Sequence, residues 1–251
     1  MLKIIFSIRR HATSVSVSLL AFSLIGCATA PAIDANSQQY YNAAIADAAV
    51  ATPEKVSDLL PLPPGPTVSV ISWVTESRAP CHADETQCAL SVGADRLWVT
   101  LAGEVQTMCR SWKLSGDPLR RRLEQLLGLP LDPPPQYRKV KFVTIEVARD
   151  RIERACLGVD ETDVAHPRCT FYAKQDTSVE LRNFVGQQMA GSYVVGNPNG
   201  PGYPYTRLGY TYDWNPVSAA HNHYGASEFL IAPNTVAKAI AQVTTDEYCK
   251  P

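Results

Sequence analysis

The sequence lacks the patterns that identify the commonest catalytic and nucleotide-binding sites. It contains no phosphate-binding glycine loop, no GxSxG nucleophile elbow, no HExxH zinc motif and no EF-hand loop. Histidine is also scarce, because only His82, His166, His221 and His223 lie outside the first 26 residues. With no motif to support an enzyme or a cofactor site, we expect a protein that is not an enzyme and uses no cofactor.

Long apolar runs and a basic excess are absent as well. No apolar run reaches the roughly 20 residues that a membrane-spanning helix needs. The chain has 23 Lys and Arg against 24 Asp and Glu, and its only dense basic run is Arg120-Arg121-Arg122. A nucleic-acid-binding surface requires a concentrated basic face. We therefore expect neither a spanning helix nor a nucleic-acid partner.

The first residues have the layout of a secretory signal. Lys3, Arg9 and Arg10 occur without any acidic residue, and an apolar stretch with small residues follows at 12–25. A positive segment, a short apolar segment and a small-residue cleavage zone are typical of an exported protein. We predict that residues 1–26 are a signal peptide.

The cleavage zone is more specific than that of an ordinary signal. Leu24-Ile25-Gly26-Cys27 resembles the lipobox of bacterial lipoproteins. The resemblance implies cleavage before Cys27, a diacylglycerol on its thiol and an acylated amine; two or three acyl chains would anchor the protein stably. In that class an Asp after the Cys retains the protein in the inner membrane, and Ala28 stands here. The expected location is the cell envelope, at the outer membrane if the host has two membranes; an ordinary signal with a chance Cys is the alternative.

Setting Cys27 aside leaves an even number of cysteines, and exported proteins meet oxidising conditions. Two pairs bracket short polar stretches, and the remaining two would join the middle of the domain to its C-terminus. A metal site is the alternative, because His82 and His166 lie beside cysteines, but neither segment has CxxC spacing. The six cysteines allow 15 connectivities. Local loop closure favours Cys81–Cys88, Cys156–Cys169 and Cys109–Cys249.

The chain divides into three parts. After the predicted signal, residues 27–66 form a lipidated tether and lead-in, which ends with the PLPPGP run at 61–66. Residues 67–251 form one globular domain of ordinary size.

Strand-like and helix-like runs alternate in this domain without a strict βαβ rhythm. The predicted class is therefore α+β, a single disulfide-stapled domain with a mixed or antiparallel sheet and three to four helices. β-branched and aromatic residues predict strands at 67–75, 96–101, 139–147, 207–214 and 227–231, and helical spacing predicts helices at 103–112, 117–128, 178–190 and 234–243.

Residues 191–231 are rich in tyrosine and predict a hairpin of 207–214 with 224–231. If the hairpin is symmetric, Asp213 faces Asn222 and Arg207 faces Glu228. One face would then be core, and the other would show Arg207, Thr211, Asp213, Tyr224 and Glu228. A slip of one residue would exchange the faces.

Three interpretations of this region follow. The tyrosines, among them Tyr203, Tyr205 and Tyr224, could contact an envelope protein or a glycan. Asp213 and Glu228 could divide acid and base roles, with Arg207 orienting an anionic group, as in a periplasmic hydrolase. Asp213, His221 and His223 could hold a metal ion, although a solvated turn is the commoner role of such a loop. We expect a lipid-anchored binding or accessory protein of the envelope, with the hydrolase as alternative.

Overall fold

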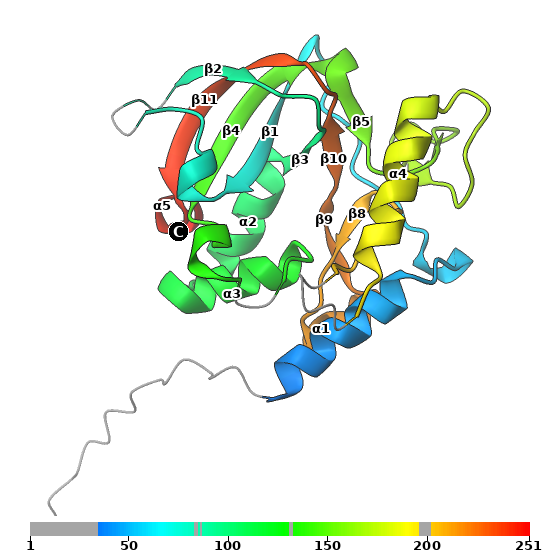
Figure 1. Ribbon diagram of the computed structural model, residues 1–251, viewed down its shortest axis with the longest axis horizontal. Helices are drawn as coiled ribbons and strands as arrows, with labels where there is room; N and C mark the ends of the chain where they lie inside the picture. The colour runs from blue at the N-terminus through cyan, green and yellow to red at the C-terminus, as the bar shows by residue number, and fades with distance from the viewer. Residues whose placement is uncertain (1–34, 83–84, 86, 131–132, 196–201) are drawn as a thin grey trace, which may run out of the picture.

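The computed structural model describes residues 35–82, 85, 87–130, 133–195 and 202–251 and shows an α+β fold, as predicted (Figure 1). Cys27 and most of the predicted turn at 197–202 lie outside the described residues. None of the described helices is long and apolar enough to cross a membrane. The α-helices are α1 (Ala35–Ala48), α2 (Ala102–Trp112), α3 (Gly116–Leu126), α4 (Val179–Ser192) and α5 (Thr245–Cys249). Short 3₁₀ turns are η1 (Pro53–Lys55), η2 (Glu76–Arg78), η3 (Pro135–Tyr137), η4 (Arg149–Arg151) and η5 (Pro216–His221).

The core element is a seven-stranded sheet in the order β2-β11-β4-β1-β3-β10-β5. Every pairing in it is antiparallel. Two further pairs, β6 with β7 and β8 with β9, stand outside it. The strands are β1 (Thr67–Val74), β2 (Cys88–Ser91), β3 (Leu97–Leu101), β4 (Lys141–Ala148), β5 (Ile152–Arg154), β6 (Val159–Asp160), β7 (Arg168–Cys169), β8 (Tyr210–Tyr212), β9 (Tyr224–Ser227), β10 (Phe229–Ile231) and β11 (Val236–Thr244).

The central strands β1 and β4 carry buried apolar side chains on both faces, although Ser69 and Glu146 are exposed. They pair from Thr67 with Ala148 to Val74 with Lys141. Side chains alternate between faces along a strand, so two apolar layers result. Val70 and Ile145 belong to one layer, and Trp73 and Phe142 belong to the other.

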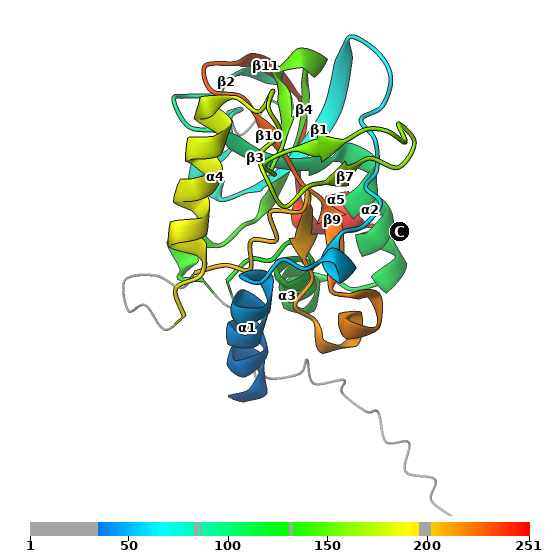
Figure 2. The same ribbon diagram turned by 90° about the vertical axis from the view of Figure 1, so that its right-hand side faces the viewer.

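Helices α2, α3 and α5 cover the layer that contains Trp73 and Phe142. Helix α4 packs around Val185 and Leu230, away from α2 and α5 (Figures 1 and 2). The predicted helices at 103–112, 117–128 and 178–190 are thus present as α2, α3 and α4.

The predicted helix at 234–243 is wrong, because this segment is the strand β11. Alanines give the segment a helical composition, yet β11 pairs with β2 on one side and with β4 on the other. Ala239 is fully buried opposite Ile145. Pairing between two strands overrides local propensity here.

All three predicted disulfides are formed. Cys81–Cys88 closes the loop before β2, Cys109–Cys249 joins α2 to α5, and Cys156–Cys169 joins the segment after β5 to β7. The Cα–Cα distances are 5.5, 5.3 and 6.1 Å in that order, within the usual range for disulfides.

The folded part begins before residue 67. Tyr41, Ile45 and other residues on one side of α1 are buried against Tyr212 and Trp214. The rings of Tyr41 and Trp214 form a T-shaped pair with centroids 5.5 Å apart, and the Tyr41 hydroxyl donates to the Gly202 carbonyl at 2.8 Å. The described part of the predicted tether therefore belongs to the domain, because an apolar helix face finds a matching surface on β8 and the segment after it.

Candidate ligand-binding pocket

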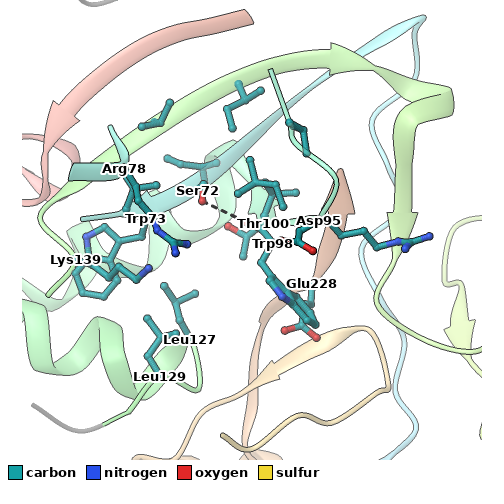
Figure 3. A pocket seen from close by; sticks show the side chains of 18 of the residues that line it. Ser72, Trp73, Arg78, Asp95, Trp98, Thr100, Leu127, Leu129, Lys139 and Glu228 are labelled. Atoms are coloured by element: carbon teal, nitrogen blue, oxygen red, sulfur yellow. Dashed lines mark hydrogen bonds between the residues drawn. The ribbon is translucent and has the colours of Figure 1, made fainter. Parts of the chain in front are cut away.

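A pocket of about 750 Å³ lies beside β1, β3 and β4 and next to the segment that follows α3 (Figure 3). We call it the main pocket. Its size is within the range of small-molecule sites, about 300–1,000 Å³. Its apolar lining includes Ile71, Trp73, Trp98, Leu127, Leu129 and Phe142, and its polar lining includes Ser72, Arg78, Asp95, Arg96, Thr100, Lys139, Gln188, Tyr203, Thr211 and Glu228.

Aromatic contacts fix the apolar walls. The Trp73 ring stacks on Phe142 with centroids 5.6 Å apart, and its Nε1 donates to Thr245 Oγ1 at 2.9 Å. The rings of Trp98 and Tyr205 form a T-shaped pair with centroids 5.6 Å apart. Side chains held on several sides keep one rotamer, so the pocket is preformed.

The wall after α3 is held at its backbone. Gly128 has φ +64°, a conformation that favours glycine, and a Cβ there would approach the Tyr212 carbonyl to 3.3 Å. One residue later, the Leu129 carbonyl accepts a hydrogen bond from Trp214 Nε1 at 3.1 Å. The chain reversal at Gly128 thus places Leu127 and Leu129 along the pocket.

Two cationic side chains lie together at one end of the main pocket, Arg78 and Lys139 (Figure 3). Arg78 ends η2, directly after β1, and Lys139 precedes β4. Antiparallel pairing brings these two strand ends together, with the Val140 amide donating to the Val74 carbonyl at 2.9 Å. Burial, followed by the charge of Arg78, lowers the pKa of Lys139.

Glu228 stands at the other end of the pocket, beside Trp98 (Figure 3). Its Oε2 is shielded from solvent and has no hydrogen-bond partner among the described residues, although the residue as a whole is partly exposed. Burial raises the pKa of this carboxyl well above its usual value. The neighbouring Tyr203 donates to Gln188 Oε1. Burial is the main cause that raises the pKa of Tyr203 to about 12, and the charge of Glu228 contributes.

The other two members of the predicted acid–base site lie elsewhere. Both Asp213 oxygens bind Arg122, at 3.0 and 2.6 Å. Arg207 donates to the Ala49 carbonyl at 3.1 Å and to Met189 Sδ at 3.5 Å. Within the described part of the chain, no ion pair joins Arg207 or Asp213 to Glu228, and only Glu228 lines the main pocket.

The hairpin register explains this difference. Tyr210 pairs with Ser227 and Tyr212 with Tyr224, through an irregularity. The predicted symmetric pairing of Asp213 with Asn222 and of Arg207 with Glu228 is wrong, because Asn222 and His223 have positive φ values and the Asp213 amide donates to the His223 carbonyl. Residues 229–231 then leave the hairpin as β10 and join the main sheet.

Two residues of the predicted polar face, Thr211 and Asp213, are buried. Thr211 donates to the Leu126 carbonyl at 2.6 Å, while Tyr212 and Trp214 pack against α1. Both sides of β8 are therefore covered, one by α3 and the other by α1. An antiparallel hairpin commonly has one solvent-exposed face, but neither face of β8 is exposed here.

The three candidate metal ligands, Asp213, His221 and His223, are not assembled into a site. His223 Nδ1 lies 2.8 Å from the Asp213 carbonyl oxygen, and its ring stacks on Tyr212. His221 is exposed at the end of η5. Among the described residues, no group of three or more His, Cys, Asp or Glu side chains is placed to hold a metal ion.

Of the three tyrosines proposed as contact residues, only Tyr203 lines the main pocket. Tyr205 is buried, and its hydroxyl donates to the Ala155 carbonyl at 2.8 Å. Tyr224 stacks on Tyr210 with centroids 3.9 Å apart. Tyr205 is therefore a core residue, whereas Tyr224 is partly exposed and its hydroxyl donates to the Asp58 carbonyl at 3.1 Å.

A smaller pocket of about 360 Å³ lies near β5 and is lined by Arg154 and Phe229, among others. The Arg154 guanidinium sits 4.2 Å above the Phe229 ring and donates to the Leu60 carbonyl. Burial lowers the pKa of Arg154 to about 10. The Arg154 guanidinium is therefore already bound by two groups of the protein, the Phe229 ring and the Leu60 carbonyl.

Comparison with known proteins adds no relative, since the chain matches no family model, no curated protein and no solved structure.

Proposed function

We propose that this protein is a lipid-anchored protein of the cell envelope that binds a small ligand in the main pocket and does not transform it. The observation that carries the proposal is the main pocket itself, about 750 Å³, which combines aromatic and aliphatic walls with polar and charged side chains. Preformed pockets of this size that combine apolar walls with placed polar groups are typical of ligand sites.

The proposal does not include hydrolysis. A two-carboxylate mechanism needs both groups at one reacting bond. Asp213 is occupied by Arg122 outside the main pocket, and Arg207 is engaged by Ala49 and Met189. Glu228 alone offers one buried carboxyl, which suits hydrogen bonding to a ligand.

The anchor is supported by the sequence Leu24-Ile25-Gly26-Cys27 and by cysteine usage. Six of the seven cysteines form disulfides, which fits an oxidising compartment, and Cys27 is the seventh. Ala28 after it favours the outer membrane in a host with two membranes. Metabolic labelling with an alkyne fatty acid should label the wild type but not Cys27→Ala, and equal labelling would contradict the anchor.

Ligand binding is tested with phenylnaphthylamine, a neutral dye that fluoresces in apolar sites. We expect saturable binding to the wild type and loss of binding in Leu129→Trp, which places a larger side chain in the pocket wall. Leu114→Trp is the matched control, because Leu114 is 37% exposed and does not line the pocket. Binding that survives Leu129→Trp, or no binding to the wild type, would contradict the proposed function.

A further inference from the structure

The two ends of the main pocket differ in charge. Arg78 and Lys139 lie at one end, and Asp95 and Glu228 lie toward the other, near Trp98 (Figure 3). Arg96 also lines the pocket, but its Nε donates to Glu153 at 2.7 Å. The unequal ends would orient a ligand that carries one charged group.

Among the residues that the structure describes, no carboxylate pairs with either cation at this end. The neighbouring acid, Glu76, binds Lys141 at 2.6 Å instead. No ion pair involving Arg78 or Lys139 is formed among the described residues, and two like charges lie side by side. Lys139 is partly buried, so its charge has also lost hydration. Bringing a desolvated cation next to another cation is unfavourable, and a bound anion would relieve both costs.

The surroundings of the cations are apolar. Trp73, Leu127 and Leu129 line the same pocket, and Figure 3 places them next to Arg78 and Lys139. Charge-assisted hydrogen bonds to a carboxylate or a phosphate are about twice as strong as neutral ones. An apolar body attached to that anion would lie against Trp73 and the two leucines.

We infer that the ligand is an amphipathic anion, with a carboxylate or phosphate group bound between Arg78 and Lys139 and an apolar body along Trp73, Leu127 and Leu129. This inference rests on the proposed function and adds the chemical class of the ligand. A second anionic group at the far end would lie beside Asp95 and the carboxyl of Glu228, a group whose own negative charge is disfavoured by burial. The site therefore selects one negative charge, at one end.

Two dyes of similar shape separate the inference from the proposed function. Anilinonaphthalene sulfonate carries one negative charge, while phenylnaphthylamine has the same aromatic body without it. We expect the anionic dye to bind the wild type more tightly than the neutral dye. In the double variant Arg78→Gln/Lys139→Met, the affinity for the anionic dye should fall about tenfold or more, while the affinity for the neutral dye is unchanged.

The matched control is Arg182→Gln/Lys238→Met, which removes the same charge from exposed positions outside the pocket. Arg78 is exposed and Lys139 carries a desolvated charge, so we expect the test variant to fold. Unchanged binding of the neutral dye reports that it has folded. If the test variant loses the neutral dye as well, Arg78→Gln alone is measured, and it should still lower the affinity for the anionic dye.

The outcomes are distinct. Equal affinity of the two dyes for the wild type, or anionic binding that survives removal of both cations, would overturn the inference and leave the proposed function standing. No binding of either dye, or binding unaffected by Leu129→Trp, would overturn both.

Competition then identifies the charged group. Decanoate, decyl phosphate and decyltrimethylammonium have the same apolar chain and differ only in their head groups. Displacement by decanoate points to a free fatty acid, and displacement by decyl phosphate points to a phospholipid-type head group; either supports the inference. Displacement by decyltrimethylammonium as effective as that by both anions would contradict it.

Discussion

Asp213 was a candidate catalytic group, but its contacts assign it a structural role. Its two oxygens bind the Arg122 guanidinium at 3.0 and 2.6 Å, and one also accepts from the Asn215 amide at 3.1 Å. The carboxylate side chain is 4% exposed and that of Arg122 is 20% exposed. Arg122 also lies 4.6 Å above the Trp112 ring. This pair connects the hairpin to α3.

Asp213→Ala leaves the Arg122 charge without its partner. Removing one member of a buried ion pair costs about 3–5 kcal/mol, and we expect about 3 kcal/mol because Arg122 is partly solvated. Urea unfolding followed by tryptophan fluorescence measures this loss. Asp117→Ala is the control: its carboxylate is 78% exposed and pairs with Arg120 at 3.3 Å, so we expect less than about 1 kcal/mol.

The refuting result is an Asp213→Ala variant that unfolds at the same urea concentration as the wild type. It would mean that the ion pair contributes nothing and that a functional role for Asp213 must be reconsidered. A double-mutant cycle with Arg122→Met isolates the coupling between the two side chains. A coupling near zero would lead to the same conclusion.

Three further predictions concern stability. The pKa of Glu228 is raised above its unfolded value of 4.5, so Glu228 ionises in the unfolded chain before it ionises in the folded protein as the pH rises. The free energy of unfolding therefore falls from about pH 4.5 up to the folded pKa. Thermal melts of Glu228→Gln should lack this decline, and parallel pH profiles of variant and wild type would contradict it. Ile45→Ala should cost about 2–4 kcal/mol in urea unfolding because Ile45 is 1% exposed in α1, and a loss near zero would show that α1 does not stabilise the domain. Cys109→Ala/Cys249→Ala opens a loop of 140 residues and should cost about 4–5 kcal/mol in the chain-entropy model, more than removing Cys81–Cys88, which spans 7; the opposite order would contradict the loop-length reasoning.

Local patterns in the sequence predicted the elements that local interactions decide. The leucines of 117–128 have helical spacing, and Gly128 permits the reversal that ends α3. Cys81 and Cys88 are close in sequence, so loop closure favours their pairing. Once two local pairs are assigned, Cys109 and Cys249 are the remaining partners.

Features that depend on distant partners were not predictable in this way. The segment 234–243 has the composition of a helix, but it forms a strand because it pairs with both β2 and β4. The hairpin register depended on Asn222 and His223, whose positive φ values no periodicity reveals.

The main pocket shows the same limitation. Arg78 and Lys139 are far apart in the sequence and meet only because β1 pairs with β4. The one signal available was their position relative to the predicted strands: Arg78 lies three residues after the strand at 67–75, and Lys139 is the first residue of the strand at 139–147. Two charged strand ends become a site only when the pairing of those strands is known. Glu228 was recognised as a candidate, but its buried position in the pocket wall depended on β10 leaving the hairpin.

A crystal structure of the protein with decanoate would show directly whether the main pocket binds an amphipathic anion. We expect electron density for the ligand in this pocket, with its carboxylate between Arg78 and Lys139 and its chain against Trp73 and Leu129. Density in another place, or a carboxylate at the Glu228 end of the pocket, would contradict it.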